Sequence, residues 1–329
     1  MGGVLDSRLL CGDVREVLPT LVAGSVQCVV TSPPYWGLRD YGTATWEGGT
    51  AECDHRETGN RNDGGRSRLD GFNGSKATDS DKGASQYRNT CRKCGAKRID
   101  NQIGLEPTPE KYVTTMVKVF REVKRVLRDD GTVWLNLGDS YCGTGSKGAY
   151  TDPKHPEGRN GQVVAVNAKI EGLKPKDLVG IPWRVAFALQ SDGWYLRSDI
   201  VWAKGVSFCP DYAGSVMPEP VTDRPTKSHE YLFLLTKSAR YFYDAEAVRE
   251  QGTGRDWSKV GGNIMGKGVH KVGAQYQTID RDGRESATGR NLRSVWTINP
   301  QPYREAHFAT FPTTLVEPCV KAGSKQGDT

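Results

Sequence analysis

Long apolar runs are missing from this chain of 329 residues. No stretch approaches the roughly 18 consecutive apolar residues that a membrane-spanning helix requires. The N-terminus also lacks the basic region and apolar segment of a secretory signal peptide. Apolar residues make up 36% of the chain, and the mean hydropathy is −0.59. These absences predict a cytoplasmic protein with no membrane partner.

Cysteine is also scarce, with eight in the chain. In the cytoplasm these thiols stay reduced, so close pairs indicate metal binding rather than disulfides. Cys-x-x-Cys followed by glycine is a common half of a zinc site, and residues 91–95 have this pattern. We therefore predict a zinc ion with four ligands, Cys53, His55, Cys91 and Cys94. The alternative is four unrelated reduced side chains.

Positive charge is concentrated in the segment that runs from the first pair through the second. Residues 56–98 hold eleven Lys and Arg against five acids, so their net charge of 11 − 5 = +6 equals that of the whole chain. Residues 43–100 are rich in Gly, Ser, Asn and Asp and show no helical or strand period, so we interpret them as an insertion. Its basic character suggests a polyanionic partner. The alternative is a solvated surface insertion.

Elsewhere, candidate strands and helices alternate, which is typical of a doubly wound α/β sheet. Glu230–Thr236 and 241–243 resemble a hairpin, which would add an antiparallel edge. In order, we expect a strand–helix–strand unit in residues 8–36, a helix from Pro109 to Leu127 with Thr108 as its N-cap, and a strand from Thr132 to Leu137. A helix over 178–189, a strand from Trp194 to Trp202, this hairpin and a helix ending near Gly323 follow.

An apolar strand, Val26–Val30, runs directly into Thr31-Ser32-Pro33-Pro34-Tyr35-Trp36. Each proline lacks an N–H and fixes φ near −65°, so the loop has little conformational freedom. Such a loop can hold the Ser32 hydroxyl, the Pro33 carbonyl and the Tyr35 ring in a fixed relation. That trio suits a planar ring with an exocyclic amino group. The alternative is a proline-rich turn that only ends a strand.

Taken with Leu9-Leu10-Cys11-Gly12-Asp13, this loop resembles the S-adenosylmethionine-dependent DNA amino-methyltransferases. The closest match is the permuted group, in which the catalytic loop precedes the glycine-rich cofactor loop. The resemblance implies a Rossmann-like sheet and a target base that flips out of double-stranded DNA to stack on tyrosine. It implies four catalytic residues, Ser32, Pro33, Pro34 and Tyr35.

The same resemblance implies a site for S-adenosylmethionine. Asp13 would contact the cofactor adenine, and aromatic and proline residues would pack around its methionine end. The other cofactor-binding residues implied are Thr31, Phe308, Phe311 and Pro312. It also divides the chain into a catalytic core (1–42 and 101–244), the basic insertion with its zinc site (43–100), a target-recognition segment (245–295) and a cofactor-pocket helix (296–329).

Serine in Ser32-Pro33-Pro34-Tyr35 is more typical of cytosine-N4 enzymes, whereas aspartate is more typical of adenine-N6 enzymes. We therefore expect a site-specific cytosine-N4 methyltransferase, with adenine N6 as the alternative target. Two other functions are alternatives to DNA methylation: an inactive, truncated DNA-binding remnant, and a methyltransferase that acts on RNA or protein.

In relatives, Gly-Asp-Thr is followed by a strand and an acidic glycine-rich loop. Here Gly327-Asp328-Thr329 ends the sequence. We therefore expect the central strand of the sheet to be missing or supplied elsewhere, by a separate polypeptide or by a second copy in a homodimer. The chain alone is expected to bind S-adenosylmethionine poorly.

Overall fold

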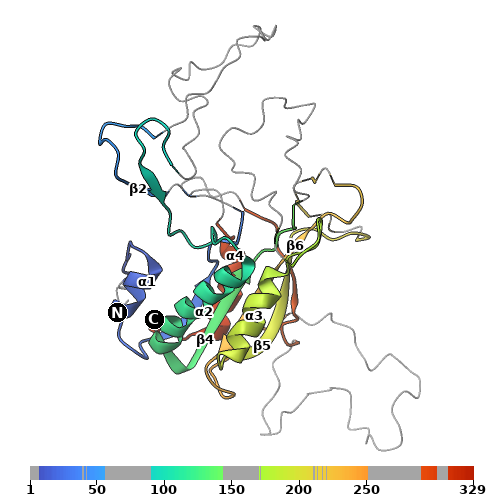
Figure 1. Cartoon of the computed structure of the whole chain (residues 1–329). Helices are drawn as coiled ribbons and strands as arrows, with labels where there is room; N and C mark the ends of the chain where they lie inside the picture. Colours follow the sequence, from blue (N-terminus) through green and yellow to red (C-terminus); the bar gives the residue numbers. More distant parts are fainter. Residues whose placement is uncertain are drawn as a thin grey trace, which may run out of the picture. The chain divides into compact units, whose positions relative to one another are not determined.

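The computed structural model describes residues 7–38, 41, 43–55, 90–143, 170, 172–209, 212, 214–216, 218–219, 221–250, 290–301 and 310–329 (Figure 1). The chain forms two compact units. The first comprises Met1–Ser32, Val119–Asn136 and Ala186–Thr329, and the second comprises Pro33–Lys118 and Leu137–Val185. No helix among the described residues is long and apolar enough to cross a membrane.

A five-stranded mixed sheet forms the centre of the first unit. Its strands lie in the order β1 (Val26–Thr31), β4 (Leu127–Leu137), β6 (His229–Thr236), β5 (Tyr195–Ala203) and β7 (Val295–Thr297). β1 runs parallel to β4, and β5 runs parallel to β7 but antiparallel to β6. The predicted mixed α/β sheet is therefore present.

The predicted edge hairpin is wrong in detail. β6 lies between β4 and β5, and residues 241–243 form no strand. Instead, the Phe242 amide donates to the Asp130 carbonyl at 2.8 Å. The last five residues of β6 are buried, as suits an interior strand covered on both faces.

The expected strand near Leu10 is also wrong. Residues 7–12 form no strand, and the side chain of Leu9 is 96% exposed. The chain instead enters the short helices α1 (Val14–Val17) and η1 (Leu18–Thr20) before β1. β1 is thus an outer strand of the described sheet. Two of its amides, those of Gln27 and Cys28, donate to the Thr329 carbonyl at 2.6 and 3.3 Å.

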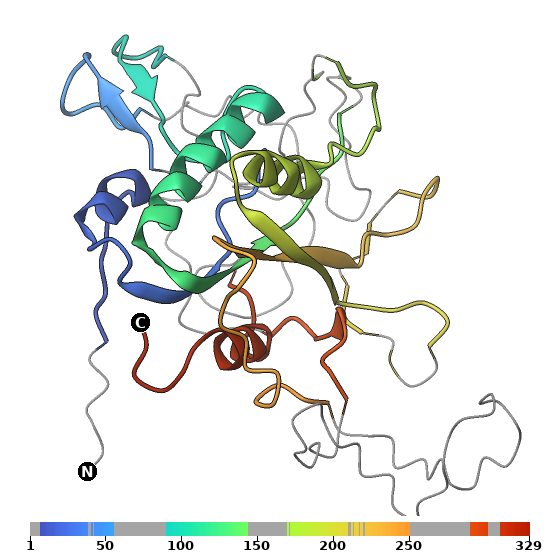
Figure 2. The same ribbon diagram turned by 90° about the horizontal axis from the view of Figure 1, so that it is seen from below.

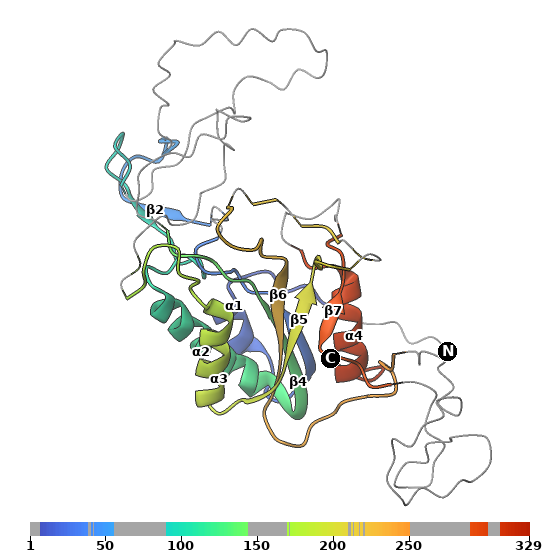
Figure 3. The ribbon, with the colours of Figure 1, turned by 90° about the vertical axis from the view of Figure 1, so that its right-hand side faces the viewer.

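Helices cover both faces of the sheet in the first unit. Residues 119–126 of α2 (Pro109–Val126) and 186–191 of α3 (Ile181–Ser191) lie on one face, and α4 (Thr313–Gly323) lies on the other (Figures 2 and 3). α2 begins at Pro109, as the sequence predicted. α4 also ends at the predicted residue, Gly323.

α4 packs closely on β1 and β4. The shared core includes Trp134 from β4 and Leu315, Cys319 and Ala322 from α4. A Cβ atom at Gly323 would lie 2.8 Å from the sulfur of Cys28, which is closer than non-bonded atoms approach. Glycine therefore lets the end of α4 approach the sheet.

The second unit contains a small antiparallel pair, β2 (Thr45–Glu47) and β3 (Lys97–Ile99). Thr45 lies opposite Ile99, so the two ends of the predicted insertion are joined. Sequence periodicity missed these strands because three residues are too few to show an alternation. Residues 56–89, between the strands, lie outside the described part of the chain.

Candidate active site and candidate metal centre

The catalytic loop predicted from the sequence begins at the carboxyl end of β1. In the first unit, Thr31 closes β1 opposite Leu135 of β4, and half-buried Ser32 follows it. This register fixes where the chain leaves the sheet. The carboxyl ends of parallel strands are where open α/β sheets gather their ligands.

Tyr35 lies against the backbone of Gly138 in the second unit. A Cβ atom at Gly138 would lie 2.6 Å from Cε2 and 2.8 Å from Cδ2 of the Tyr35 ring. Any side chain at this position would displace the ring. Gly138 directly follows β4, so the end of a buried strand sets one side of the Tyr35 position.

A buried hydroxyl holds the loop one residue earlier. The Tyr112 hydroxyl, from α2, donates to the Pro34 carbonyl at 3.0 Å. Tyr112 is fully buried. Burial, together with the negative charge of Glu106, raises the pKa of Tyr112, so the hydroxyl remains a protonated donor. α2 therefore orients the central proline pair.

The far side of the loop is held by the segment that precedes α2. The Trp36 indole donates to the Glu106 carbonyl at 2.8 Å, and the Gly37 amide donates to the Gly104 carbonyl at 2.8 Å. Gly104 has a φ of +99°, and a Cβ there would lie 3.0 Å from the Tyr35 carbonyl oxygen. Hydrogen bonds on each side of Tyr35 thus limit the loop to one arrangement.

Asp139 connects the end of β4 to the start of α3. Its Oδ1 accepts hydrogen bonds from the amides of Gly180 and Ile181, both at 3.0 Å, and from the Ser140 amide at 2.9 Å. A carboxylate that accepts from the first amides of a helix acts as its N-terminal cap. Asp139 therefore positions the chain that leaves Gly138.

The sequence analysis did not assign three of these supporting residues, Gly104, Tyr112 and Gly138. Tyr112 lies within the helix predicted to end at Leu127, and that prediction gives no sign of a hydrogen bond to the loop. Gly138 lies in the strand-end segment 136–141, whose position at the carboxyl edge of the sheet was the available signal.

Asp13, predicted to contact the cofactor adenine, caps α1 in the first unit. Its Oδ1 accepts from the Arg15 amide at 2.8 Å and from Arg15 Nε at 2.9 Å, and its Oδ2 accepts from Arg15 Nη2 at 2.5 Å. The hydrogen bond from the Arg15 side chain is the main reason that the pKa of Asp13 is lowered. An adenine amino group would have to share this carboxylate with Arg15.

Of the other predicted cofactor residues, Thr31 is the last residue of β1, and two lie at the start of α4. Buried Pro312 is the N-terminal cap of α4, and half-buried Phe311 packs against the core that contains Trp134 and Leu315. Phe308 falls outside the described residues. The chemical types of these side chains suit S-adenosylmethionine. The Asp13 carboxylate can accept a hydrogen bond from the adenine amino group, and Phe311 offers an apolar ring.

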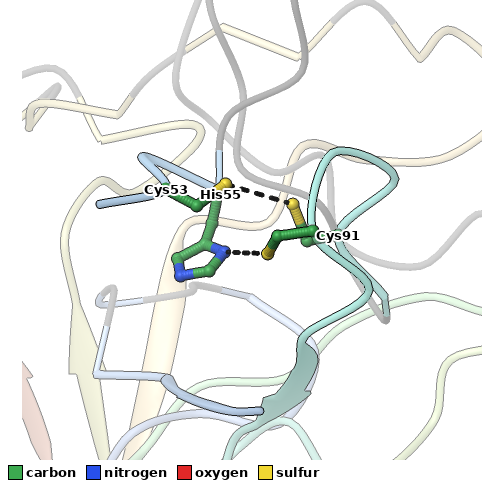
Figure 4. Close-up of side chains that lie close together, drawn as sticks. Cys53, His55 and Cys91 are labelled. Carbon is green, nitrogen blue, oxygen red and sulfur yellow. Dashed lines mark hydrogen bonds between the residues drawn. The ribbon is translucent and has the colours of Figure 1, made fainter. Parts of the chain in front are cut away.

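The four predicted metal ligands lie together in the second unit. Figure 4 labels three of them, Cys53, His55 and Cys91. One ligand atom from each of Cys53, His55, Cys91 and Cys94 lies within 4.8 Å of all the others. The sulfurs of Cys53 and Cys91 are 3.7 Å apart, and the Cys94 sulfur is 3.5 Å from His55 Nδ1. Backbone hydrogen bonds from Thr50 and Ala96 lower the pKa of the Cys94 thiol to about 6.

A rigid Pro-Pro-Tyr loop at the end of a parallel strand in a mixed α/β sheet is the arrangement of a methyltransferase that acts on amino groups. Residues 26–329 match the N6/N4 family model described as DNA methylase. The chain belongs to this family, the S-adenosylmethionine-dependent DNA amino-methyltransferases. The resemblance inferred from the sequence is confirmed, and so is the α/β fold class.

Curated relatives support the same assignment. The chain is 40% identical to the type II methyltransferase M.Cfr9I of Citrobacter freundii over 98% of its own length and 74% of that protein. It is also 40% identical to M.XycI of Xanthomonas campestris pv. cyanopsidis, with the same coverage of both chains. Among solved structures it resembles the PvuII DNA methyltransferase (cytosine-N4-specific), at 13% identity and a TM-score of 0.46, over 96% of this chain and 70% of that one.

Proposed function

We propose that the protein methylates the exocyclic amino group of cytosine, N4, at a specific sequence in double-stranded DNA. The observation that carries this proposal is the restrained Ser32–Tyr35 loop. It starts at the end of β1, is hydrogen-bonded to Tyr112 and has its aromatic ring against Gly138. Such restraint suits a reaction in which positioning supplies most of the catalysis.

Each loop group has a separate role towards the flipped base. The Tyr35 ring stacks on the base and holds its plane. The Ser32 hydroxyl oxygen and the Pro33 carbonyl accept the two hydrogens of the amino group. Accepting both hydrogens draws the nitrogen lone pair out of conjugation with the ring and makes the nitrogen nucleophilic. No covalent bond between protein and base is required.

Asp13, Thr31, Phe311 and Pro312, with Phe308 outside the described residues, would hold S-adenosylmethionine. When bound, this cofactor supplies an electrophilic methyl group on a sulfonium centre. The Asp13 carboxylate would accept from the adenine amino group, and Phe311 and Pro312 would contact the apolar parts of the ligand. The lowered pKa of Asp13 keeps this acceptor ionised near neutral pH.

Cytosine is favoured over adenine by one residue. Ser32 stands where the adenine-N6 enzymes more typically carry aspartate. Its hydroxyl is neutral and can accept from the amino group or donate to a ring nitrogen. Adenine N6 remains the alternative target, because the family includes both.

Two segments would bring the enzyme to its DNA. Residues 56–98 carry a net charge of +6, and residues 245–295 carry nine bases against six acids. Basic segments gain affinity for DNA by releasing counterions from the phosphates. We assign sequence recognition to residues 245–295, as in the permuted methyltransferases.

Transfer of a labelled methyl group tests the proposal. The chain, supplemented with the polypeptide expected to supply the glycine-rich loop, is incubated with labelled S-adenosylmethionine and, separately, duplex DNA, RNA or a protein mixture. Label should enter DNA alone. Tyr35→Ala should lose base stacking worth about 1–3 kcal/mol, and Ser32→Ala should lower the rate of transfer. Tyr195→Ala, at an exposed tyrosine, is the matched control. Full activity in both loop variants would refute these assignments.

A further inference from the structure

We propose that Cys53, His55, Cys91 and Cys94 bind one zinc ion, and that the role of this ion is structural. The four residues come from the two ends of the 43–100 insertion and meet in the second unit (Figure 4). This metal site goes beyond the proposed methyl transfer, which does not require it.

The spacing of the ligand atoms matches a tetrahedral zinc site. With Zn–S near 2.3 Å and Zn–N near 2.0 Å, tetrahedral geometry places two sulfurs about 3.8 Å apart and a sulfur and nitrogen about 3.5 Å apart. The Cys53–Cys91 sulfurs are 3.7 Å apart, and Cys94 Sγ lies 3.5 Å from His55 Nδ1. All four atoms fall within 4.8 Å of one another, so one ion can reach them all.

The type and number of ligands indicate a closed, structural site. Three thiolates and one imidazole make a Cys₃His set, which is common in structural zinc sites and fills all four positions. Soft sulfur ligands also favour zinc over magnesium or calcium, which take oxygen ligands. A fourth position open to water, as in catalytic zinc sites, is not left.

One pair of ligands lies on a preformed turn. The Gly95 amide donates to the Cys91 carbonyl at 2.8 Å, and the Cys91 amide donates to the Ala96 carbonyl at 2.8 Å. Gly95 has a φ of +77°, a conformation that favours glycine. The turn leads directly into β3, so the pair is fixed to a strand.

The other pair is held by packing. The His55 ring stacks on Trp46 of β2, with ring centroids 4.3 Å apart and an interplanar angle of 14°. The Cys53 amide donates to the Thr50 carbonyl at 3.2 Å. A Cβ at Gly49 would lie 2.6 Å from the Cys94 sulfur, so glycine leaves room for that ligand.

The surrounding core is too small to explain the cluster without metal. Its buried members are Cys91 and Ala96, with Trp46, Cys53 and Cys94 packed against them. Small units with little apolar core are commonly held together by a metal or by disulfides. A disulfide does not describe this arrangement, since bonded sulfurs lie about 2.05 Å apart and those of Cys53 and Cys91 are 3.7 Å apart.

The ion would fasten the two ends of residues 56–90, which lie between the ligand pairs, to the β2–β3 pair. If the protein acts on DNA as proposed, losing the ion should weaken DNA binding. This consequence rests on the proposed function, whereas metal binding itself does not. The test therefore measures metal first, and independently of methylation.

Metal content of the full-length protein is measured by mass spectrometry after purification without a histidine tag, under reducing conditions. We expect about one zinc per chain, as a single four-ligand site requires. Cys91→Ser/Cys94→Ser should lose it. Cys11→Ser/Cys209→Ser, which changes two cysteines outside the cluster, should retain it. His55→Cys should also retain it, because four thiolates bind zinc as well.

Substitution with Co²⁺ keeps the proposal testable if the double variant fails to fold. The wild-type protein should show the intense visible bands of tetrahedral Co²⁺ and the ultraviolet charge-transfer bands of thiolate ligands, and added zinc should remove both. Wild-type protein with no more zinc than the double variant would overturn the proposal. So would a Co²⁺ spectrum without thiolate bands, or a Cys53–Cys91 disulfide in the reduced preparation.

Discussion

At the scale of single residues, the position of the Tyr35 ring depends on the absence of a Cβ atom at Gly138. The ring edge approaches so closely that a Cβ at Gly138 would lie 2.6 Å from Cε2. Contacts this short do not occur between non-bonded atoms, so ring and methyl group cannot both keep their places. The strand end thus restrains the group proposed to stack on the target base.

Gly138→Ala should therefore displace the Tyr35 ring and slow methyl transfer at least tenfold, equivalent to about 1.4 kcal/mol in activation free energy. Single-turnover rates with DNA check this, and circular dichroism confirms that the variant is folded. Gly172→Ala, at a φ of +81° and with no atom within 4 Å of a Cβ, adds backbone strain without a clash and controls for general destabilisation. An unchanged rate in Gly138→Ala would contradict a role for the ring position.

Tyr112→Phe removes the hydroxyl that donates to the Pro34 carbonyl at 3.0 Å. Deleting one partner of a buried hydrogen bond costs about 1–3 kcal/mol, so the free energy of unfolding should fall by about that amount. The catalytic loop should also loosen, which lowers kcat more than it raises KM for DNA.

Denaturant titration and steady-state kinetics measure these two effects. Tyr195→Phe, at a tyrosine that is 46% exposed, controls for loss of a hydroxyl as such. If Tyr112→Phe lowered stability but left kcat unchanged, the hydrogen bond would support only the fold.

The loop residues could be predicted because their chemistry is local. Ser32 to Tyr35 are consecutive in the sequence, and the two prolines among them indicate a rigid loop. Tyr112 and Gly138 could not be assigned, because their roles depend on contacts with residues far away in the sequence. The two Cys/His pairs are an intermediate case, since spacing identified each pair and only the β2–β3 pairing brings the pairs together.

At the scale of elements, the proposed recognition segment is fastened at its base. The amides and carbonyls of Glu250 and Arg290 bond to each other, both at 3.0 Å. The Glu250 carboxylate also accepts from Arg290 Nε at 2.7 Å and Arg293 Nε at 3.0 Å. This cluster, with Arg293 as the larger contributor, lowers the pKa of Glu250 to about 2.

This low pKa predicts a pH-dependent contribution to stability. The carboxyl group of an unfolded glutamate has a pKa of about 4.3, above its value of about 2 in the folded protein. The contribution is therefore complete above about pH 4.3 and is lost as the pH falls towards about 2. The Tm difference between wild type and Glu250→Gln should be largest near neutral pH and shrink over that acid range. A difference that does not change with pH would contradict the ionic role of Glu250. Glu317→Gln, in an exposed pair with Lys321, is the control.

Helix α2 could be predicted because apolar residues recur in it at helical spacing and because Pro109 marks where it begins. The hairpin could not be predicted correctly in this way. Residues 237–240 look like a tight turn, but Phe242 bonds to Asp130, far earlier in the chain. Strand neighbours in a mixed sheet are set by such distant contacts, which local patterns do not record.

At the scale of the whole molecule, membership of the DNA amino-methyltransferases explains why the loop, the sheet edge and the basic segments occur in one chain. The family follows from a match over residues 26–329. Membership of the family does not distinguish cytosine N4 from adenine N6 as the target atom, because the family name covers both. The target atom depends on how the Ser32–Tyr35 loop receives a base.

Nucleoside analysis of the product tests that central claim most directly. Unmethylated duplex DNA is incubated with S-adenosylmethionine and the chain, supplemented with the polypeptide expected to supply the glycine-rich loop. The DNA is then digested to nucleosides, which are separated by liquid chromatography with mass spectrometry. The account predicts N4-methylcytosine, absent from a parallel reaction with Tyr35→Ala. Finding only N6-methyladenine would contradict the choice of base, and finding 5-methylcytosine would contradict amino-group methylation altogether.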